Sequence, residues 1–145
     1  MKLLNSFGPN PRAVRMFVLE KGMDLPTEDL DLLAGEKRAE PYLKKNPGGQ
    51  MPALELDDGT IIAETVVICE YLEELQPEPV LIGADALARS NTRMWLRRVE
   101  LNITEHMYNG FRFGEGIDLF RDRVYCIPEA ADGLKAKAKH GRKWL

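Results

Sequence analysis

A chain of 145 residues is long enough for one ordinary domain, or for a small domain joined to part of another. With 44% hydrophobic and 30% charged residues, the composition is that of a globular protein with a core and excludes an extensively disordered chain. A formal net charge of −3 gives no general attraction to nucleic acid or to an anionic membrane. No apolar run is long enough to cross a bilayer. We therefore expect a cytoplasmic protein with no nucleic-acid partner and no membrane partner.

The spacing of the cysteine and histidine residues indicates neither a metal site nor a dithiol redox centre. Cys69 and Cys126 do not form a CxxC pair, which excludes a zinc ribbon and a dithiol redox centre. His106 and His140 lie far apart on predicted helices and form no ligand cluster. We expect no metal site.

The first part of the chain alternates short apolar runs with helical patterns. Residues 2–5 predict a short strand and residues 27–32 a second one. Between them, Asn10 offers an N-cap oxygen, Pro11 fits the first helical position and Gly22 ends the helix. Because a helix connects the two strands, they should be parallel, with a right-handed crossover.

A short charged helix is predicted over residues 35–45. Residues 53–56 and 60–63 flank the turn signal Asp57-Asp58-Gly59 and predict a hairpin, so the sheet is mixed. A helix follows over residues 65–76. Its predicted buried side consists of Val67, Ile68, Tyr71, Leu72 and Leu75. The order strand, helix, strand, helix, hairpin, helix is the thioredoxin arrangement, with a mixed four-stranded sheet and three helices. The fold class is therefore α/β.

The remainder of the chain changes character after Pro77-Glu78-Pro79. We assign residues 1–76 to the thioredoxin-like domain, 77–85 to a linker and 86–145 to an all-helical domain. One long helix is indicated by an apolar residue at every fourth position, namely Trp95, Val99, Ile103 and Met107. A second runs from Pro128 to the end, with Leu134, Ala138, Gly141 and Leu145 inward. It ends without a C-cap signal, so we expect the helical domain to be incomplete.

Two loop segments have the features of a ligand site. Pro52 stands at a strand entry, where proline marks an edge or a cis peptide bond, and a cis Met51-Pro52 bond would offer the Met51 backbone groups to an extended peptide. The alternative is a plain turn before a strand. Glu64-Thr65 opens a helix, whose free N–H groups favour a carboxylate while Glu64 can accept from an ammonium group. An α-amino-acid head satisfies both, and simple N-capping is the alternative.

The combination of Asn46-Pro47, Gln50-Met51-Pro52 and Glu64-Thr65 resembles the cytosolic glutathione transferase family, of bacterial type. The similarity extends into residues 93–98, which resemble the first helix of that family's helical domain. Only the joint pattern is specific.

This resemblance implies a glutathione site with glutathione as co-substrate. Met51, before Pro52, would pair its backbone with the cysteinyl unit, and Gln50 would contact the tripeptide backbone. Glu64 and Thr65 would hold the γ-glutamyl head. Lys37 and Arg38 match positions where the family often places a basic side chain on the glycyl carboxylate. A solvated helix face is the alternative for these two.

The sequence departs from the family where the thiol is activated. Related bacterial members often have Ser-Pro-Asn-x-Arg at this point, whereas this chain has Gly8-Pro9-Asn10-Pro11-Arg12. Gly8 has no side chain to donate. Our hypothesis is that Asn10, or Ser6 reached by a shifted loop, holds the sulfur. Helix N-capping is the competing role for Asn10.

We therefore predict a transferase that conjugates the glutathione thiolate to small hydrophobic electrophiles. Tyr108 and Phe111 are candidates for the electrophile wall, with a place in the core as the alternative. The family generally forms homodimers. Two other functions remain open at this stage, a glutathione-dependent disulfide reductase and a non-catalytic binding protein on the same fold. Gly8 favours both of these, whereas Gln50 and Glu64-Thr65 argue against the second.

Overall fold

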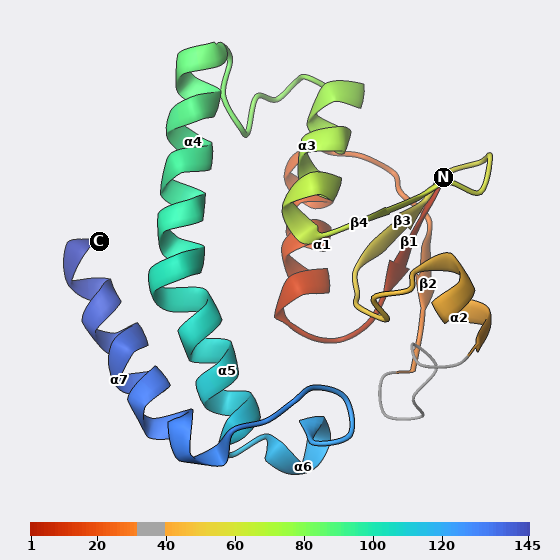
Figure 1. The fold of residues 1–145 in the computed structure, drawn as a ribbon. Coiled ribbons are helices and arrows are strands. Elements are labelled where there is room, and N and C mark those ends of the chain that lie inside the picture. The colour runs from red at the N-terminus through yellow and green to blue at the C-terminus, as the bar shows by residue number, and fades with distance from the viewer. Residues whose placement is uncertain (32–39) are drawn as a thin grey trace. The chain divides into compact units, whose positions relative to one another are not determined.

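The computed structural model describes residues 1–31 and 40–145, which form two compact units, Met1–Ile82 and Gly83–Leu145 (Figure 1). In these ranges no helix is both long and apolar enough to cross a membrane.

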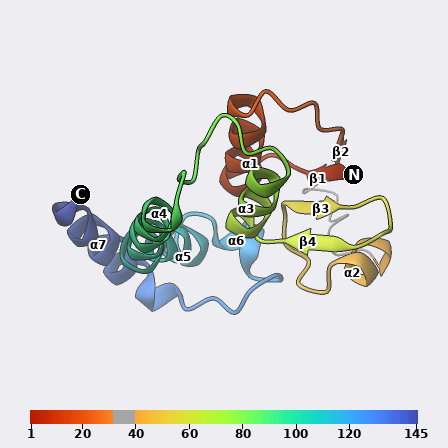
Figure 2. The ribbon, with the colours of Figure 1, turned by 90° about the horizontal axis from the view of Figure 1, so that it is seen from above.

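The first unit is built on a mixed four-stranded sheet. Its strands are β1 (Lys2–Asn5), β2 (Thr27–Asp29), β3 (Ala53–Glu55) and β4 (Ile61–Ala63), in the spatial order β2-β1-β3-β4. β1 and β2 are parallel, as the helical connection requires, and the other two pairs are antiparallel. The arrows of β3 and β4 accordingly point in opposite directions in Figure 2. The predicted thioredoxin-like sheet is confirmed, although β2 ends at Asp29, before the predicted residue 32.

In the described residues of the first unit, three α-helices accompany the sheet, α1 (Pro9–Glu20), α2 (Glu40–Lys45) and α3 (Thr65–Leu75). α2 occupies the described end of the helix predicted over 35–45, and its predicted beginning lies outside the described residues. The predicted N-cap of α1 is wrong. Gly8 is the N-cap residue and Asn10 is the second residue of the helix, because Pro9 and not Pro11 takes the first helical position.

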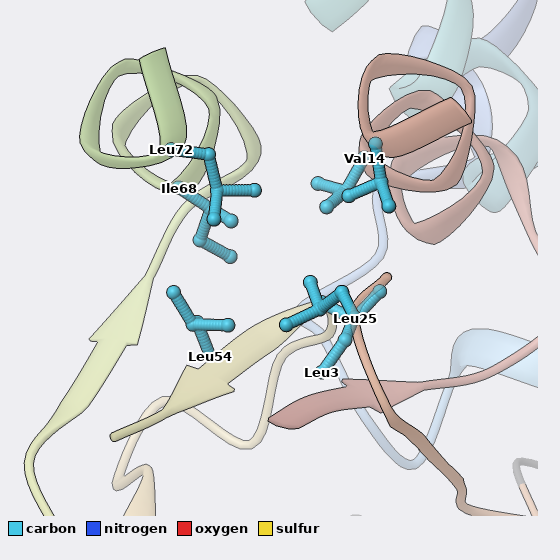
Figure 3. Packing of buried hydrophobic residues seen from close by; sticks show 7 residues of the cluster. Leu3, Val14, Leu25, Leu54, Ile68 and Leu72 are labelled. Atoms are coloured by element: carbon cyan, nitrogen blue, oxygen red, sulfur yellow. The ribbon is translucent and has the colours of Figure 1, made fainter. Parts of the chain in front are cut away.

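The two faces of the sheet carry separate apolar clusters, because neighbouring residues of a strand point to opposite faces. Leu3 and Leu54 face α1 and α3, which lie side by side, and the core between these layers is drawn in Figure 3. That core consists of Leu3, Val14, Val18, Leu25, Leu54, Ile68 and Leu72. Leu4 and Ala53 face the other way and pack with Tyr42 of α2 and with Met51.

The buried stripe of α3 is narrower than predicted. Ile68 and Leu72, one helical turn apart, are fully buried, and Tyr71 packs against the same core. Val67 and Leu75 are 50% and 52% exposed, so their predicted burial is wrong. Val67 lies about 100° around the helix from Ile68, outside the contact line, and Leu75 is the last residue of the helix.

Residues 76–82 are tied to the first unit by a buried ion pair between Lys21 and Glu73. The Lys21 ammonium donates to the carbonyl oxygens of residues 76, 77 and 79, at 2.8, 3.2 and 2.6 Å. One Glu73 oxygen accepts from the backbone N–H groups of Leu81 and Ile82, at 3.0 and 2.9 Å. Proline-rich backbone that forms no sheet or helix therefore has its polar groups satisfied by two side chains.

All the regular secondary structure of the second unit is helical. Its elements are α4 (Ala86–Val99), a π-helical turn (Glu100–Thr104), α5 (Glu105–Phe113), α6 (Ile117–Phe120) and α7 (Ala131–Gly141), with short 3₁₀ turns on both sides of α7. The single long helix that the Trp95 stripe predicts is thus interrupted by the π-helical turn, and α6 was not predicted.

α7 packs on α5 and on the π-helical turn. Ala138 and Gly141 are buried, as predicted, and a Cβ atom at Gly141 would overlap with the Asn102 carbonyl oxygen. Leu145 is 74% exposed, so its predicted inward position is wrong. It follows the helix and a 3₁₀ turn, and the helical period does not extend to it.

Candidate functional site

The candidate residues of the first unit converge at one end of the sheet. In the antiparallel pair of β1 and β3, Leu4 is opposite Ala53, so the end of β1 lies beside the start of β3. In the pair of β3 and β4, Ala53 is opposite Ala63, so the end of β4 lies there too. The residues that follow β1, precede β3 and follow β4 are therefore neighbours. The sequence predicted this for the last two segments.

The Met51–Pro52 peptide bond at the start of β3 is cis, as expected. The Met51 side chain is buried beside Leu4 and Ala53. Within the described part of the chain, neither backbone polar group of Met51 has a hydrogen-bond partner. The loop therefore presents a donor and an acceptor to an extended backbone, which is how a peptide adds to a sheet.

Glu64 and Thr65 stand where β4 turns into α3. Glu64 is the N-cap residue, with φ of 71° and ψ of 124°, and it is the non-glycine residue of the described chain with positive φ. Its side chain makes no capping hydrogen bond, so the N-capping alternative for Glu64 is excluded. A positive φ costs free energy in a residue that has a side chain, and such strain clusters at binding and catalytic sites. Because the Glu64 side chain is also not used for capping, we treat Glu64 as a candidate binding residue. Glu64 is exposed, and Thr65 at the first helical position is half-buried.

The end of β1 is fixed by a polar network. Arg15 of α1 donates to the Asn5 side-chain oxygen at 2.6 Å and to the Ser6 carbonyl oxygen at 3.0 Å. The Asn5 amide donates to Asp29 at 2.5 Å, which connects the ends of β1 and β2. Arg15 was not predicted from the sequence. The signal that could have indicated it is its place one helical turn after Pro11, on the same side of the first helix.

Ser6 lies next in the chain and is 4% exposed, and its hydroxyl oxygen has no partner among the described residues. Ser6 borders an open pocket of about 660 Å³ together with Asn5, Phe7 and Arg15 on one side and Asp29 and Leu30 on the other. A buried hydroxyl without a partner is rare in folded proteins and calls for a ligand or another function.

Gly8 precedes α1 with φ of 129° and ψ of 166°. Residues with a side chain rarely adopt this backbone conformation. The loop is therefore built for glycine, and a serine would not fit there without strain. Asn10, exposed in the first turn of α1, already takes part in a polar or electrostatic interaction.

Two helix N-termini point toward this end of the sheet, since α1 follows β1 and α3 follows β4. The first turn of α3 carries N–H groups that no helical hydrogen bond uses, whereas Pro9 and Pro11 of α1 have no N–H, so α1 contributes mainly the partial positive charge of its N-terminus. Cys69 lies in α3, where burial raises the pKa of its thiol to about 11. A thiol of that pKa stays protonated at neutral pH and does not act as a nucleophile.

The remaining candidates lie outside the described part of the first unit. Lys37 and Arg38 lie outside the described residues. Tyr108 and Phe111 belong to α5 of the second unit, where burial raises the pKa of the Tyr108 hydroxyl and the Phe111 ring packs edge-on against Phe120 at 6.1 Å between centroids. Among the described residues, no group of three or more His, Cys, Asp or Glu side chains is arranged to hold a metal.

Comparison with known proteins places these features in a family. Residues 7–75 match the family model for the glutathione S-transferase N-terminal domain. Glutathione S-transferase 2 of Saccharomyces cerevisiae is 32% identical over 145 residues, which cover 95% of this chain and 60% of that protein. A maleylacetoacetate isomerase of Pseudomonas aeruginosa is 39% identical over 82 residues, or 55% of this chain and 39% of the isomerase.

The solved structures agree. The crystal structure of a glutathione S-transferase domain-containing protein from Marinobacter aquaeolei VT8 has a TM-score of 0.89 and 32% identity, over 100% of this chain and 72% of that one. The chain belongs to the glutathione S-transferase family, as its motifs predicted. It spans only 60% and 39% of the two curated relatives named above.

Proposed function

We propose that the end of the sheet formed by Ser6, Met51 and Glu64-Thr65 binds glutathione, and that the protein transfers the glutathione thiolate to small hydrophobic electrophiles. One observation carries the proposal: two features lie at the same end of the sheet. The first is the Met51 backbone, whose N–H and C=O have no partner among the described residues, and the second is the start of α3, where Glu64 is strained and forms no cap. The first suits an extended peptide and the second an α-amino-acid head. Glutathione contains both.

Each side chain then has a distinct role. Met51 pairs its backbone with the cysteinyl unit, and the exposed Gln50 side chain contacts the tripeptide backbone. Glu64 accepts from the γ-glutamyl ammonium group, while Thr65 and the N-terminus of α3 hold its carboxylate. Lys37 and Arg38 are assigned to the glycyl carboxylate.

Conjugation further requires that the bound thiol be ionised. A thiol with a pKa of ~8.5 is only a few per cent thiolate at neutral pH, and lowering that pKa by roughly two units takes about 2.7 kcal/mol of anion stabilisation. Gly8 offers no side chain for this. Ser6 has a hydroxyl without a partner among the described residues, which supports it as the donor. Asn10 is the second candidate, and the dipole of α1 assists either one.

The electrophile wall and the assembly complete the proposal. Tyr108 and Phe111 of α5 are assigned to the wall, and the family's usual homodimer and a cytoplasmic location are expected for this protein. Disulfide reduction with glutathione is a second candidate, and the positive φ of Gly8, which disfavours the usual serine in this loop, supports it.

Calorimetric titration with glutathione tests the binding site. We expect saturable binding in the wild type and at least tenfold weaker binding in Thr65→Val and Glu64→Gln, which keep the size of the side chain nearly unchanged. Leu19→Ala, an exposed position of α1, serves as the control. No binding at millimolar glutathione would overturn the proposal and leave a non-catalytic relative.

Two further measurements separate the chemical steps. The absorbance of the bound thiolate as a function of pH should show a raised thiol pKa in Ser6→Ala, in Asn10→Ala or in both, and unchanged values in both variants would contradict these assignments. Turnover of an aryl halide compared with that of a small disulfide distinguishes conjugation from reduction.

A further inference from the structure

The backbone carbonyl of Gln50 accepts two side-chain hydrogen bonds. The Tyr42 hydroxyl donates to it at 2.6 Å and the Asn46 amide at 2.8 Å. The Asn46 amide also lies 3.3 Å from the Tyr42 hydroxyl oxygen, so the three groups form a closed triangle. Tyr42 and Asn46 are 4% and 7% exposed, so both donor side chains have little access to competing water.

Tyr42 and Asn46 come together because they are four residues apart at the end of α2. The Asn46 N–H donates to the Tyr42 carbonyl oxygen at 2.8 Å, which continues the helical pattern by one residue. Burial raises the pKa of Tyr42, while the hydrogen bond from Asn46 acts in the opposite direction. The Tyr42 hydroxyl therefore stays protonated at neutral pH and remains a donor.

Fixing the Gln50 carbonyl also fixes the Met51 N–H, because both belong to one planar peptide unit. In a trans peptide the oxygen and the amide hydrogen point in opposite directions, so the two donors that hold the oxygen determine where the N–H points. Hydrogen bonds to the carbonyl also polarise the amide and strengthen the N–H as a donor. The Tyr42 ring and the Met51 side chain pack in one apolar cluster with Leu4 and Ala53.

We propose that Tyr42 and Asn46 are positioning residues that aim the Met51 N–H at the cysteinyl unit of the ligand. The proposal rests on the proposed glutathione site. It differs from a purely structural role of the Tyr42–Asn46 pair in one respect. Loss of the two donors affects only ligands that accept a hydrogen bond from the Met51 N–H, whereas loss of folding affects every ligand.

The experiment combines Tyr42→Phe, Asn46→Ala and the double variant with two ligands. Each single variant should weaken glutathione binding roughly threefold, and the double variant more than tenfold, because the carbonyl then has no donor. The KM for glutathione should rise by similar factors, with kcat at saturating glutathione within twofold of the wild type. Binding of γ-glutamyl methylamide, which has the amino-acid head but no cysteinyl carbonyl, should not change in NMR titrations.

Tyr71→Phe is the matched control, since it removes a tyrosine hydroxyl from α3, outside this network, and should leave both ligands unaffected. Thermal melting verifies that each variant is folded, and Tyr42→Phe alone carries the test if the double variant is not. Wild-type binding that persists within twofold in Tyr42→Phe and in the double variant overturns the positioning role. Equal losses for both ligands do so as well. If the wild type does not bind glutathione, the proposed function itself fails, and the positioning role fails with it.

Discussion

The ion pair of Lys21 and Glu73 provides the sharpest test of how residues 76–82 are held. The Lys21 side chain is fully buried and that of Glu73 is 12% exposed. Lys21→Met keeps most of the apolar stem but leaves Glu73 and the carbonyl oxygens at 76, 77 and 79 without their donor. Removing one partner of a buried pair costs about 3–5 kcal/mol, because the other charge stays buried.

Urea denaturation followed by circular dichroism measures this cost. At an m-value near 2 kcal/mol/M, the unfolding midpoint should fall by about 1.5–2.5 M. Lys44→Met is the matched control, since the pair of Lys44 with Glu40 is 73% and 77% exposed and its removal should cost less than about 1 kcal/mol. Hydrogen exchange should rise in the peptides that contain Leu81 and Ile82. A Lys21→Met midpoint equal to that of Lys44→Met would refute the reasoning.

The same pair predicts a sensitivity to acid. Burial opposes the ionisation of Glu73, but hydrogen bonds from Lys21 and from the Ile82 and Leu81 amides outweigh it and lower its pKa below the usual 4.5. A carboxyl whose pKa is lowered on folding contributes stability above its unfolded pKa and loses it as the pH falls through the folded value. Below about pH 4.5 the difference in stability between wild type and Glu73→Gln should therefore shrink, as measured by urea denaturation at each pH.

Glycine positions supply the remaining predictions. Gly141→Ala should destabilise the second unit, because its Cβ atom meets the Asn102 carbonyl oxygen, whereas Gly133→Ala on the same helix meets nothing within 4 Å and should stabilise it by roughly 0.5–1 kcal/mol. Both tryptophans of the chain lie in residues 83–145, so tryptophan fluorescence during denaturation reports this difference, and equal effects at the two glycines would contradict the packing. Gly8→Ser should cost about 1–3 kcal/mol through its positive φ and should not lower the pKa of a bound thiol. A Gly8→Ser protein that is as stable as the wild type and has more bound thiolate would show that the loop accommodates the usual family residue.

Much of the candidate site followed from the sequence, because it depends on local backbone chemistry. We could expect the cis Met51–Pro52 peptide because Pro52 stands directly before a strand. The start of α3 at Thr65 follows from the end of an apolar strand pattern. Neither the positive φ of Glu64 nor the lack of a partner for the Ser6 hydroxyl among the described residues has a local signal in the sequence.

The sequence by itself determined the order of the elements in the first unit, the mixed sheet and the family of the protein, because alternation, turn residues and helix breakers act over a few residues. Tertiary structure decided which of these residues work together. Tyr42 and Asn46 reach the Gln50 carbonyl, and Lys21 reaches the backbone at 76–79, only after distant segments have packed. A buried polar group must find a partner wherever the fold provides one, and that choice depends on three-dimensional proximity, not on spacing along the chain.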